Sequence, residues 1–457
     1  MTEVSAAPVT VRRLAPGPRG KPLLGSLDAF RRDPMVMFLD LRREYGDVVR
    51  IRLGPYLVHV ILGPEGVRHV LQVNQKNYSR GKFYENFKRF FGIALLTTDG
   101  QHWLGRRRLA QPIFHRKVVE GYTTTVTDTT ARFLERWAGV AERGEEIDLA
   151  EDTLHLVLTT TGRILLDVDL SVHPELLGEN VVQRLRMMMP GSISDAFPRW
   201  VPTLHRLKVA RSQRSLYRTM QGIFNAYLHD EHAGTDLIAL LRSARDPETG
   251  ELLDEEELHD QFTTLLLAGY ETTGTGLAWT LYALSKHVEV RRRLEAELDE
   301  VLGGRVPTAD DLARLPYTAM VVQESLRVYP PIWAFTRDPV EDDEIGGYHI
   351  PGGSTVIVSP YAVHRHPAYW ENPEAFDPER FTPERSAGRP PFAYMPFGGG
   401  PRKCIGYQLA LVELQLCTAM IAQRFRVHAV PGHPVGYGPL VSLKPLHGIQ
   451  ATLHPRV

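Results

Sequence analysis

The chain has 457 residues, and 53 lysines and arginines stand against 54 aspartates and glutamates, so its formal net charge is −1. This balance argues against a nucleic-acid-binding protein, which needs an excess of positive charge. Hydrophobic residues make up 43% and charged residues 23% of the chain, which excludes intrinsic disorder for most of its length. Two cysteines are too few for a disulfide framework or for a zinc or iron–sulfur site held by four cysteines.

The sequence contains neither a secretory signal nor a run of about 18 apolar residues that would span a membrane. We therefore expect a cytoplasmic protein without a membrane anchor. Residues 1–25 are rich in proline and glycine and are predicted to form an extended arm. Residues 26–457 contain no glycine- and serine-rich linker, so we predict that they form a single domain.

The elements expected in chain order are mostly helical. A β-hairpin over 47–62 turns at Gly54 and Pro55, and a largely helical stretch follows from about 115 to 325. Three prolines at 190, 198 and 202 predict a loop within that stretch. A short strand is expected at 354–359 and a last helix at 407–424. This order predicts a mainly α fold, one α-rich domain with small peripheral β-sheets.

An unusually long helix is predicted from Asp254 to about His287, because no proline interrupts this stretch. Asp254 and Glu257 have the spacing of a helix N-cap and its capping glutamate. Near the middle of the helix, Thr272 can hydrogen-bond to a carbonyl one turn earlier. Together with Glu271 it forms an acid–alcohol pair that can hold water and relay protons.

The most informative segment is the loop 397–406, with the sequence FGGGPRKCIG. Its glycines let a bulky group approach the backbone closely. Arg402, Lys403 and the amides of the following helix are expected to favour the thiolate form of Cys404. An anionic sulfur on a glycine-lined surface suits a single axial bond to a planar metal cofactor such as haem. The second cysteine, Cys417, falls within a helical pattern and is predicted to be a core residue.

The loop resembles the haem-binding signature of cytochrome P450 enzymes, with Cys404 in the position of the thiolate ligand and Phe397 at the start of the motif. The long helix resembles the oxygen-binding helix of that family, through Ala268, Gly269, Glu271 and Thr272. The resemblance implies a P450 fold around a buried haem b with a cysteine thiolate ligand and O₂ as co-substrate. It also implies that Glu271 and Thr272 deliver protons to bound oxygen.

Four residues are expected at the haem by the same resemblance. Trp103 and Arg107 match the family's WxxxR element, and Arg402 matches another usual partner of the haem propionates. Arg337 lies where many bacterial members place a third, although a surface arginine is nearly as good an interpretation. Carboxylates of this kind need cationic or hydrogen-bonding partners.

Glu324 and Arg327 form an ExxR pair on a predicted helix, three residues apart on one face. In the P450 family this pair is joined by the arginine of a PERF element, which is Arg380 here. The resemblance implies a buried network that serves the fold and the haem pocket rather than the reaction.

Residues from several separate segments together predict an apolar substrate pocket, although ordinary core packing is the favoured interpretation of each residue taken singly. The predicted lining consists of Phe83, Phe87, Phe91, Leu267, Ile332, Trp333 and Val441. The methionines at 187–189 are further candidates for a lid over this pocket.

The resemblance implies a haem-thiolate monooxygenase that inserts one oxygen atom from O₂ into an apolar substrate, by hydroxylation or epoxidation. We expect terpene or polyketide tailoring in secondary metabolism, with a fatty-acid hydroxylase or a peroxide-driven haem-thiolate enzyme as alternatives. A non-enzymatic haem sensor or carrier is a further alternative. Ferredoxin and ferredoxin reductase are the expected partners of a monomer, and NAD(P)H would act only indirectly through them.

Overall fold

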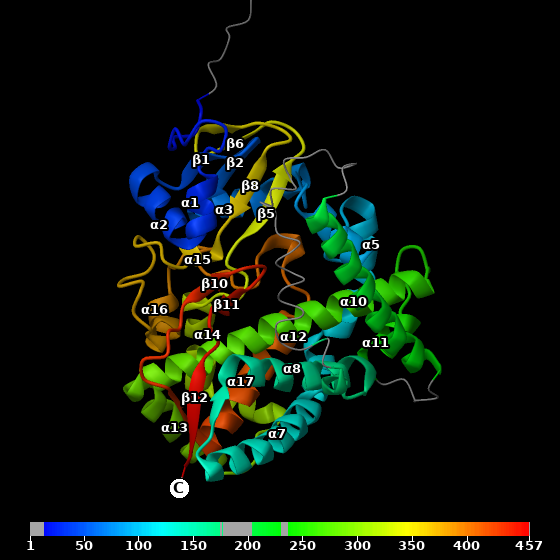
Figure 1. Ribbon diagram of the computed structural model, residues 1–457, viewed down its shortest axis with the longest axis vertical. Coiled ribbons are helices and arrows are strands. Elements are labelled where there is room, and N and C mark those ends of the chain that lie inside the picture. Colours follow the sequence, from blue (N-terminus) through cyan, green and yellow to red (C-terminus); the bar gives the residue numbers. More distant parts are fainter. Residues whose placement is uncertain (1–12, 174–175, 177–202, 230–235, 457) are drawn as a thin grey trace, which may run out of the picture.

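The computed structural model describes residues 13–173, 176, 203–229 and 236–456. Helices form most of the molecule, and the largest sheet lies at one edge, in the upper left of Figure 1. The methionines at 187–189 and the prolines at 190, 198 and 202 lie outside the described residues. The division into an arm and a single domain stays a prediction.

The helices follow the chain in this order: α1 Leu27–Arg32, α2 Pro34–Tyr45, α3 Pro64–Arg68, α4 Tyr84–Phe91, α5 Gly100–Ala110, α6 Arg116–Gly121, α7 Thr123–Arg143, α8 Leu149–Leu166, α10 Leu204–His229, α11 Leu237–Ser243, α12 Glu255–Lys286, α13 Val288–Leu302, α14 Pro316–Val328, α15 Pro360–Val363, α16 Pro383–Ser386 and α17 Tyr407–Arg424. The strands are β1 Val48–Leu53, β2 Tyr56–Ile61, β3 Tyr78–Ser79, β4 Glu146–Asp148, β5 Phe335–Pro339, β6 Asp343–Ile345, β7 Tyr348–Ile350, β8 Thr355–Val358, β9 Phe425–Ala429, β10 Tyr437–Pro439, β11 Leu443–Pro445 and β12 Gln450–Pro455. The sequence analysis predicted the hairpin β1–β2, the long helix and the last helix, but it missed α1 and α2.

Helix α12 is the longest of the described helices and crosses the middle of the molecule (Figure 1). Its 32 residues span about 48 Å at the usual rise per residue. Asp254 caps it as predicted, because its carboxylate accepts a hydrogen bond from the Glu257 backbone N–H at 2.8 Å. The Glu257 carboxylate does not complete a capping box but pairs with Arg106 of α5. Helix α12 is therefore tied to α5 from its first turn.

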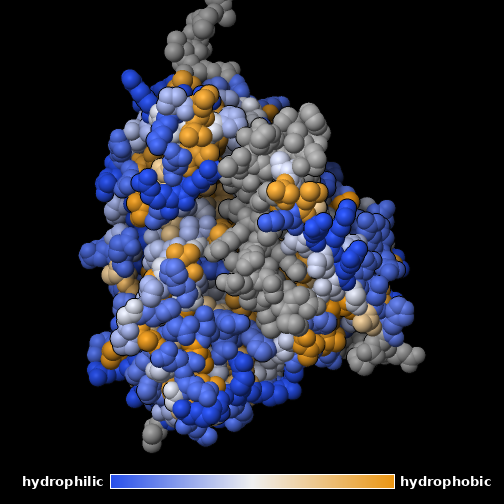
Figure 2. Space-filling view, viewed as in Figure 1, coloured by the Kyte–Doolittle hydropathy of each residue, from blue (hydrophilic) through white to orange (hydrophobic). Residues whose placement is uncertain are grey.

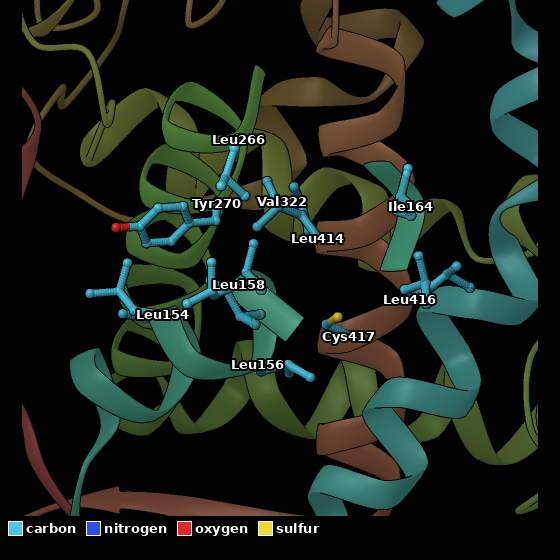
Figure 3. Close-up of a cluster of buried hydrophobic side chains, with 14 of the residues drawn as sticks. Leu154, Leu156, Leu158, Ile164, Leu266, Tyr270, Val322, Leu414, Leu416 and Cys417 are labelled. Carbon is cyan, nitrogen blue, oxygen red and sulfur yellow. The ribbon is translucent and has the colours of Figure 1, made fainter. Parts of the chain in front are cut away.

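The core packs α12 against α8 and α17. Figure 3 shows leucines of α8, Leu266 and Tyr270 of α12, and Leu414 and Leu416 of α17, all members of one buried hydrophobic cluster. Cys417 lies in this apolar cluster, is fully buried, and shares a hydrogen bond of 3.4 Å with Thr130. The prediction that Cys417 is a core residue is confirmed.

The largest sheet has the strand order β1–β2–β8–β5–β3. Strands β1 and β2 form the predicted antiparallel hairpin, and Gly54 adopts a φ of 61° in its turn. The proline-rich segment lies against this sheet, since the Arg50 N–H donates to the Pro16 carbonyl at 2.8 Å. Strand β5 pairs with β8, and Arg337 lies opposite Val356 in that register. The sheet therefore fixes the position of Arg337.

A hairpin near the C-terminal end, β10 and β11, reaches toward α12. The Trp279 indole of α12 donates to the Leu443 carbonyl at 2.7 Å, and the Trp333 indole donates to the Leu440 carbonyl at 2.8 Å. The Leu443 N–H donates to the Pro331 carbonyl at 2.8 Å. These bonds hold the hairpin turn between α12 and the segment that precedes β5.

None of the described helices combines the length and apolarity needed to cross a bilayer. Figure 2 shows a face that is mostly hydrophilic, with small scattered apolar patches.

Candidate functional site

A cavity of about 1580 Å³ lies between α12, α5, the loop 397–406 and strand β5. Pockets for one small molecule usually measure a few hundred to about 1000 Å³. The volume therefore has room for a large cofactor and a substrate together. All seven residues predicted to line a substrate pocket, and all eight predicted to contact haem, lie on its wall.

The cysteine loop forms one side of the cavity. The Cys404 N–H donates to the Phe397 carbonyl at 3.0 Å and closes the loop. Gly400 has a φ of 64°, and a Cβ there would lie 1.8 Å from the Leu71 carbonyl oxygen. A Cβ on Gly399 would lie 2.2 Å from the Phe392 ring. Glycine is therefore required at both positions for the loop to take this shape.

Cys404 is exposed and lines the cavity, in contrast to the buried Cys417. Although Cys404 is exposed to the cavity, desolvation by the surrounding protein raises the pKa of its thiol, while the Gly406 backbone N–H, Arg107 and Lys403 act in the opposite direction. The expectation that the surroundings favour the thiolate was wrong for the protein without haem, because desolvation outweighs the groups that lower the pKa. It was also wrong about Arg402, whose guanidinium bonds to the Thr98 carbonyl and the Asp99 carboxylate instead.

Three arginines meet on another wall: Arg80, Arg337 and Arg402, which we call the cavity arginines. Burial and repulsion from Arg80 lower the pKa of Arg337 to about 10 and that of Arg402 to about 9. Asp99 pairs with Arg402 at 2.6 Å and accepts the Arg80 backbone N–H. The Nε of Arg80 is buried without a hydrogen-bond partner. Among the described residues, the three guanidinium groups carry more positive charge than the paired Asp99 carboxylate neutralises.

Tyr84 and Trp103 complete this wall. Burial raises the pKa of the Tyr84 hydroxyl, but Arg80 and Arg337 outweigh burial and lower it. The Arg402 guanidinium stacks over the Trp103 ring at 4.2 Å. This cluster suits a ligand with two carboxylates, because each carboxylate would neutralise guanidinium groups that now repel one another.

Arg107 occupies a different place from the cavity arginines. Its Nη1 donates to the Lys403 carbonyl at 2.9 Å, and its charge acts on Cys404. It still lines the cavity. The structure thus brings Trp103, Arg337 and Arg402 together and places Arg107 nearer to the sulfur.

The middle of α12 faces the cavity opposite the cysteine loop. Ala268 is exposed within an otherwise largely buried helix, and Gly269 and Thr272 are half-buried. The Thr272 hydroxyl donates to the Ala268 carbonyl at 2.7 Å, as predicted. Glu271 is buried, and it accepts a hydrogen bond from the Ser442 hydroxyl at 2.5 Å. Both members of the acid–alcohol pair therefore border the cavity.

Aromatic rings form the wall around α4. Phe83 and Phe87 have ring centroids 5.2 Å apart, and Phe87 and Phe91 stack at 5.9 Å with an interplanar angle of 5°. Leu267, Ile332, Trp333 and Val441 contribute from three other segments. These side chains make the lining largely apolar.

The ExxR network lies outside the cavity and is fully buried. Arg327 donates to both carboxylate oxygens of Glu324, at 2.6 and 2.7 Å. Its remaining N–H groups bond to the carbonyls of His364, Pro373 and Ala375. The Nε of Arg380 lies 3.4 Å from Glu324, within the network. The predicted three-residue cluster is therefore present in the fold.

Sequence reasoning missed Arg80 and Asp99 in the cavity wall, Lys444 beside Glu271, and Glu413. Burial raises the pKa of Glu413 to about 8, and this carboxyl borders the cavity with one oxygen lacking a hydrogen-bond partner. None of these four residues lies in a motif that the sequence analysis used. They come together only through the packing of distant segments.

Comparison with known proteins places these features in one family. Residues 15–438 match the family model described as cytochrome P450. The chain belongs to the cytochrome P450 family. It is 37% identical to cyclooctatin synthase of Streptomyces melanosporofaciens, over 94% of this chain and 93% of the relative. It is 33% identical to pentalenene oxygenase of Streptomyces avermitilis, over 91% of each chain.

Solved P450 structures share the fold. The cyanobacterial CYP120A1 with bound retinoic acid superposes with a TM-score of 0.85 and 26% identity, covering 97% of this chain and 100% of that one. The heme domain of cytochrome P450DA gives a TM-score of 0.86 and 28% identity, covering 98% and 99%. The predicted P450 fold is confirmed, and the chain is a P450 monooxygenase, an oxidoreductase.

The family implies a haem with a cysteine thiolate ligand and O₂ as co-substrate. The residues present fit that group. An exposed cysteine, a glycine loop that leaves room for a flat surface, and an excess of guanidinium charge border the same cavity. When bound, the haem supplies the activation of oxygen, and the protein supplies position, protons and shelter from water.

Proposed function

We propose that this P450 oxidises a terpenoid substrate by hydroxylation or epoxidation in secondary metabolism. The observation that carries the proposal is the largely apolar, aromatic-walled cavity of about 1580 Å³. Relatives support it, because they include proteins named pentalenene oxygenase and cyclooctat-9-en-7-ol 5-monooxygenase. A rigid ring system buries its surface well against the stacked rings of α4.

The experiment is a binding and turnover panel on the haem-loaded protein. Cyclic diterpene hydrocarbons and pentalenene are titrated against long-chain fatty acids, and the spin-state shift of the haem spectrum gives each dissociation constant. We expect the cyclic terpenes to bind and to gain one oxygen atom. Binding and oxidation of fatty acids alone would favour the alternative of a fatty-acid hydroxylase.

Cys404 is the proposed thiolate ligand, because its sulfur borders the cavity whereas Cys417 is buried in the core. Phe397 would lie beside the haem on the cysteine side, and Ala268 and Gly269 on the opposite side. Removing the Cys404 sulfur should abolish the spectrum that is typical of thiolate ligation.

The proposed propionate site consists of Trp103, Arg337 and Arg402, extended by Arg80 and Tyr84. Arg107 contributes from the sulfur side. Support comes from the mutual repulsion of the cavity arginines, which two carboxylates would relieve. The ExxR network of Glu324, Arg327 and Arg380 is assigned to the stability of the fold.

Glu271 and Thr272 are proposed to deliver protons into the cavity. Thr272 presents a hydroxyl at the cavity wall, and Glu271 is the adjoining carboxylate. In the Thr272→Ala variant we expect substrate to bind normally while more of the supplied electrons are lost as hydrogen peroxide. Unchanged coupling in that variant would favour the alternative of a haem sensor or carrier.

Ferredoxin and ferredoxin reductase are the proposed electron donors of a monomeric enzyme, with NAD(P)H acting through them. The acid–alcohol pair argues against the peroxide-driven alternative, which needs no proton delivery to oxygen. Turnover that requires O₂ and reduced ferredoxin would support this assignment, and equal turnover with peroxide alone would contradict it. Location in the cytoplasm stays a prediction.

A further inference from the structure

The carboxylate of Glu271 is held by two side chains from outside its own helix. The Ser442 hydroxyl donates to Oε1 at 2.5 Å, and the Lys444 Nζ lies 3.1 Å from the same oxygen. All three side chains are nearly inaccessible, with exposed fractions of 5% for Glu271, 12% for Lys444 and 1% for Ser442. We call Ser442 and Lys444 the hairpin clamp.

The hairpin that carries the clamp is fixed by its backbone. Carbonyls of Leu440 and Leu443, on either side of Ser442, accept hydrogen bonds from the Trp333 and Trp279 indoles. Trp279 belongs to α12, the helix that carries Glu271. The clamp and the carboxylate are therefore held at a fixed separation by the same framework.

The charges make the clamp more than a packing contact. A buried carboxylate is costly unless a counter-charge and hydrogen bonds compensate for its lost hydration. Lys444 supplies the charge, and Ser442 supplies a hydrogen bond to the same oxygen. Helix α12 alone does not determine where this carboxylate points, since both of these partners belong to the hairpin.

The same hairpin turn also borders the cavity. Val441 lines it, whereas neither clamp residue is among the described lining residues. Substitution of the clamp should therefore leave substrate contacts intact. This separation allows proton delivery and substrate binding to be measured independently.

We propose that Ser442 and Lys444 are positioning residues for proton delivery, because both contact the same oxygen of Glu271 and hold its carboxyl group at the edge of the cavity. In this role Glu271 accepts one proton from the solvent side and releases one into the cavity, while Ser442 and Lys444 keep its carboxyl group in place. This inference rests on the proposed role of Glu271.

The experiment compares Lys444→Met, Lys444→Arg, Ser442→Ala, Glu271→Gln and the double variant Glu271→Gln/Lys444→Met. Lys286→Met is the matched control, since Lys286 is an exposed lysine at the end of α12 whose ammonium lies over the Tyr282 ring. Each haem-loaded protein is assayed for product formed per electron pair, peroxide released, substrate dissociation constant and thermal unfolding. An infrared spectrum, with that of Glu271→Gln subtracted, reports the Glu271 carboxylate band.

We expect Lys444→Met to lower the ratio of product to peroxide about tenfold, the effect of losing one charge-assisted hydrogen bond. Its substrate dissociation constant should stay within about twofold of the wild-type value. Lys444→Arg should restore coupling, Ser442→Ala should lower it about threefold, and Lys286→Met should leave it unchanged. The carboxylate band should shift in Lys444→Met. The double variant should be no worse than Glu271→Gln.

Wild-type coupling in Lys444→Met, or a full additional loss in the double variant, would overturn the proposal, because Lys444 would then act elsewhere. If Lys444→Met does not fold, unchanged coupling in Ser442→Ala would overturn it instead. Full coupling in Glu271→Gln alone would reject the proposed role of Glu271 itself. The two failures are therefore distinguished by the single glutamate variant.

Discussion

Two groups of arginines in this molecule, the ExxR network and the cavity arginines, differ in how their charge is satisfied. Arg327 of the ExxR network directs every N–H group to Glu324 or to a backbone carbonyl. Among the cavity arginines, Arg80 leaves its buried Nε without a partner, and Arg337 and Arg402 repel each other. Arg327 is therefore satisfied within the protein alone, although the Nε of Arg380 in the same network also lacks a hydrogen-bond partner. The cavity arginines carry a surplus of positive charge, which under the proposed function an anionic ligand would neutralise.

Under the proposed function, this difference separates residues that build the fold from residues that bind the cofactor. Arg327 and Arg337 are both buried, so burial alone does not distinguish the two groups. The balance of charge and hydrogen bonds does, because a buried cation without a partner is costly and is often found at functional sites.

The largest expected effect is on the ExxR network. Arg327→Ala leaves the Glu324 carboxylate buried without its partner, which should lower the free energy of unfolding by about 3–5 kcal/mol. Denaturant unfolding of the haem-free and haem-loaded proteins measures this, and both forms should be affected. Arg293→Ala is the control, because it breaks an exposed pair with Glu379 and should cost less than about 1 kcal/mol. Equal costs in the two variants would contradict the comparison.

The second effect concerns His364, which shares the ExxR network. Its Nε2 accepts the Met395 N–H at 2.8 Å, and its Nδ1 faces the Arg327 carbonyl at 3.2 Å, so the folded protein holds it neutral. Burial lowers the pKa of His364 from 6.5 to about 3. As the pH falls below 6.5, the unfolded chain is protonated first. The contribution of neutral His364 to the free energy of unfolding is therefore complete above pH 6.5 and is lost toward pH 3. At pH 4 the loss is about 3 kcal/mol.

Unfolding of wild type and His364→Gln at pH 7 and pH 4 tests this effect. Glutamine keeps a neutral donor and acceptor, so the variant should lose about 3 kcal/mol less than wild type over that interval. Parallel losses in the two proteins would show that His364 does not titrate on unfolding.

The third effect concerns the cavity arginines, where a substitution should change haem affinity rather than the stability of the haem-free protein. Arg337→Leu removes a repelling charge, so the haem-free protein should be no less stable than wild type. Its haem affinity should fall about 10- to 100-fold, the effect of losing charge-assisted hydrogen bonds. Thermal unfolding of the haem-free protein and haem transfer to excess apomyoglobin measure the two quantities. Lost stability with unchanged haem affinity would place Arg337 among the structural arginines.

The smallest expected effect is at Asp99, which pairs with Arg402 and is 39% exposed. Asp99→Asn should destabilise the haem-free protein by less than about 1 kcal/mol. Haem affinity should rise about two- to threefold, because the propionates no longer compete with this carboxylate for Arg402. A fall in haem affinity would show that Asp99 holds Arg402 in place rather than competing for it.

Local patterns predicted the parts of the molecule whose geometry is local. The glycines and Cys404 predict the loop 397–406, and the uninterrupted length and the Asp254 cap predict the long helix. The hairpin β1–β2 is likewise predicted by one short stretch of sequence with a turn at Gly54.

Parts that depend on distant packing could not be predicted in this way. Arg80 reaches the cavity only because β3 pairs with β5, and Lys444 reaches Glu271 only because two indoles anchor the C-terminal hairpin. The pKa of Cys404 was misjudged for a similar reason: its charged neighbours are visible in the sequence, but the desolvation that outweighs them is a property of the folded loop.

The most direct test of the account is the visible spectrum of the reduced, carbon-monoxide-bound haem protein in wild type, Cys404→His and Cys417→Ser. The account predicts the red-shifted Soret band of thiolate ligation in wild type and in Cys417→Ser. It predicts the ordinary band of imidazole ligation in Cys404→His. Retention of the red-shifted band in Cys404→His, or its loss in a folded Cys417→Ser protein, would contradict the assignment of Cys404 as the haem ligand.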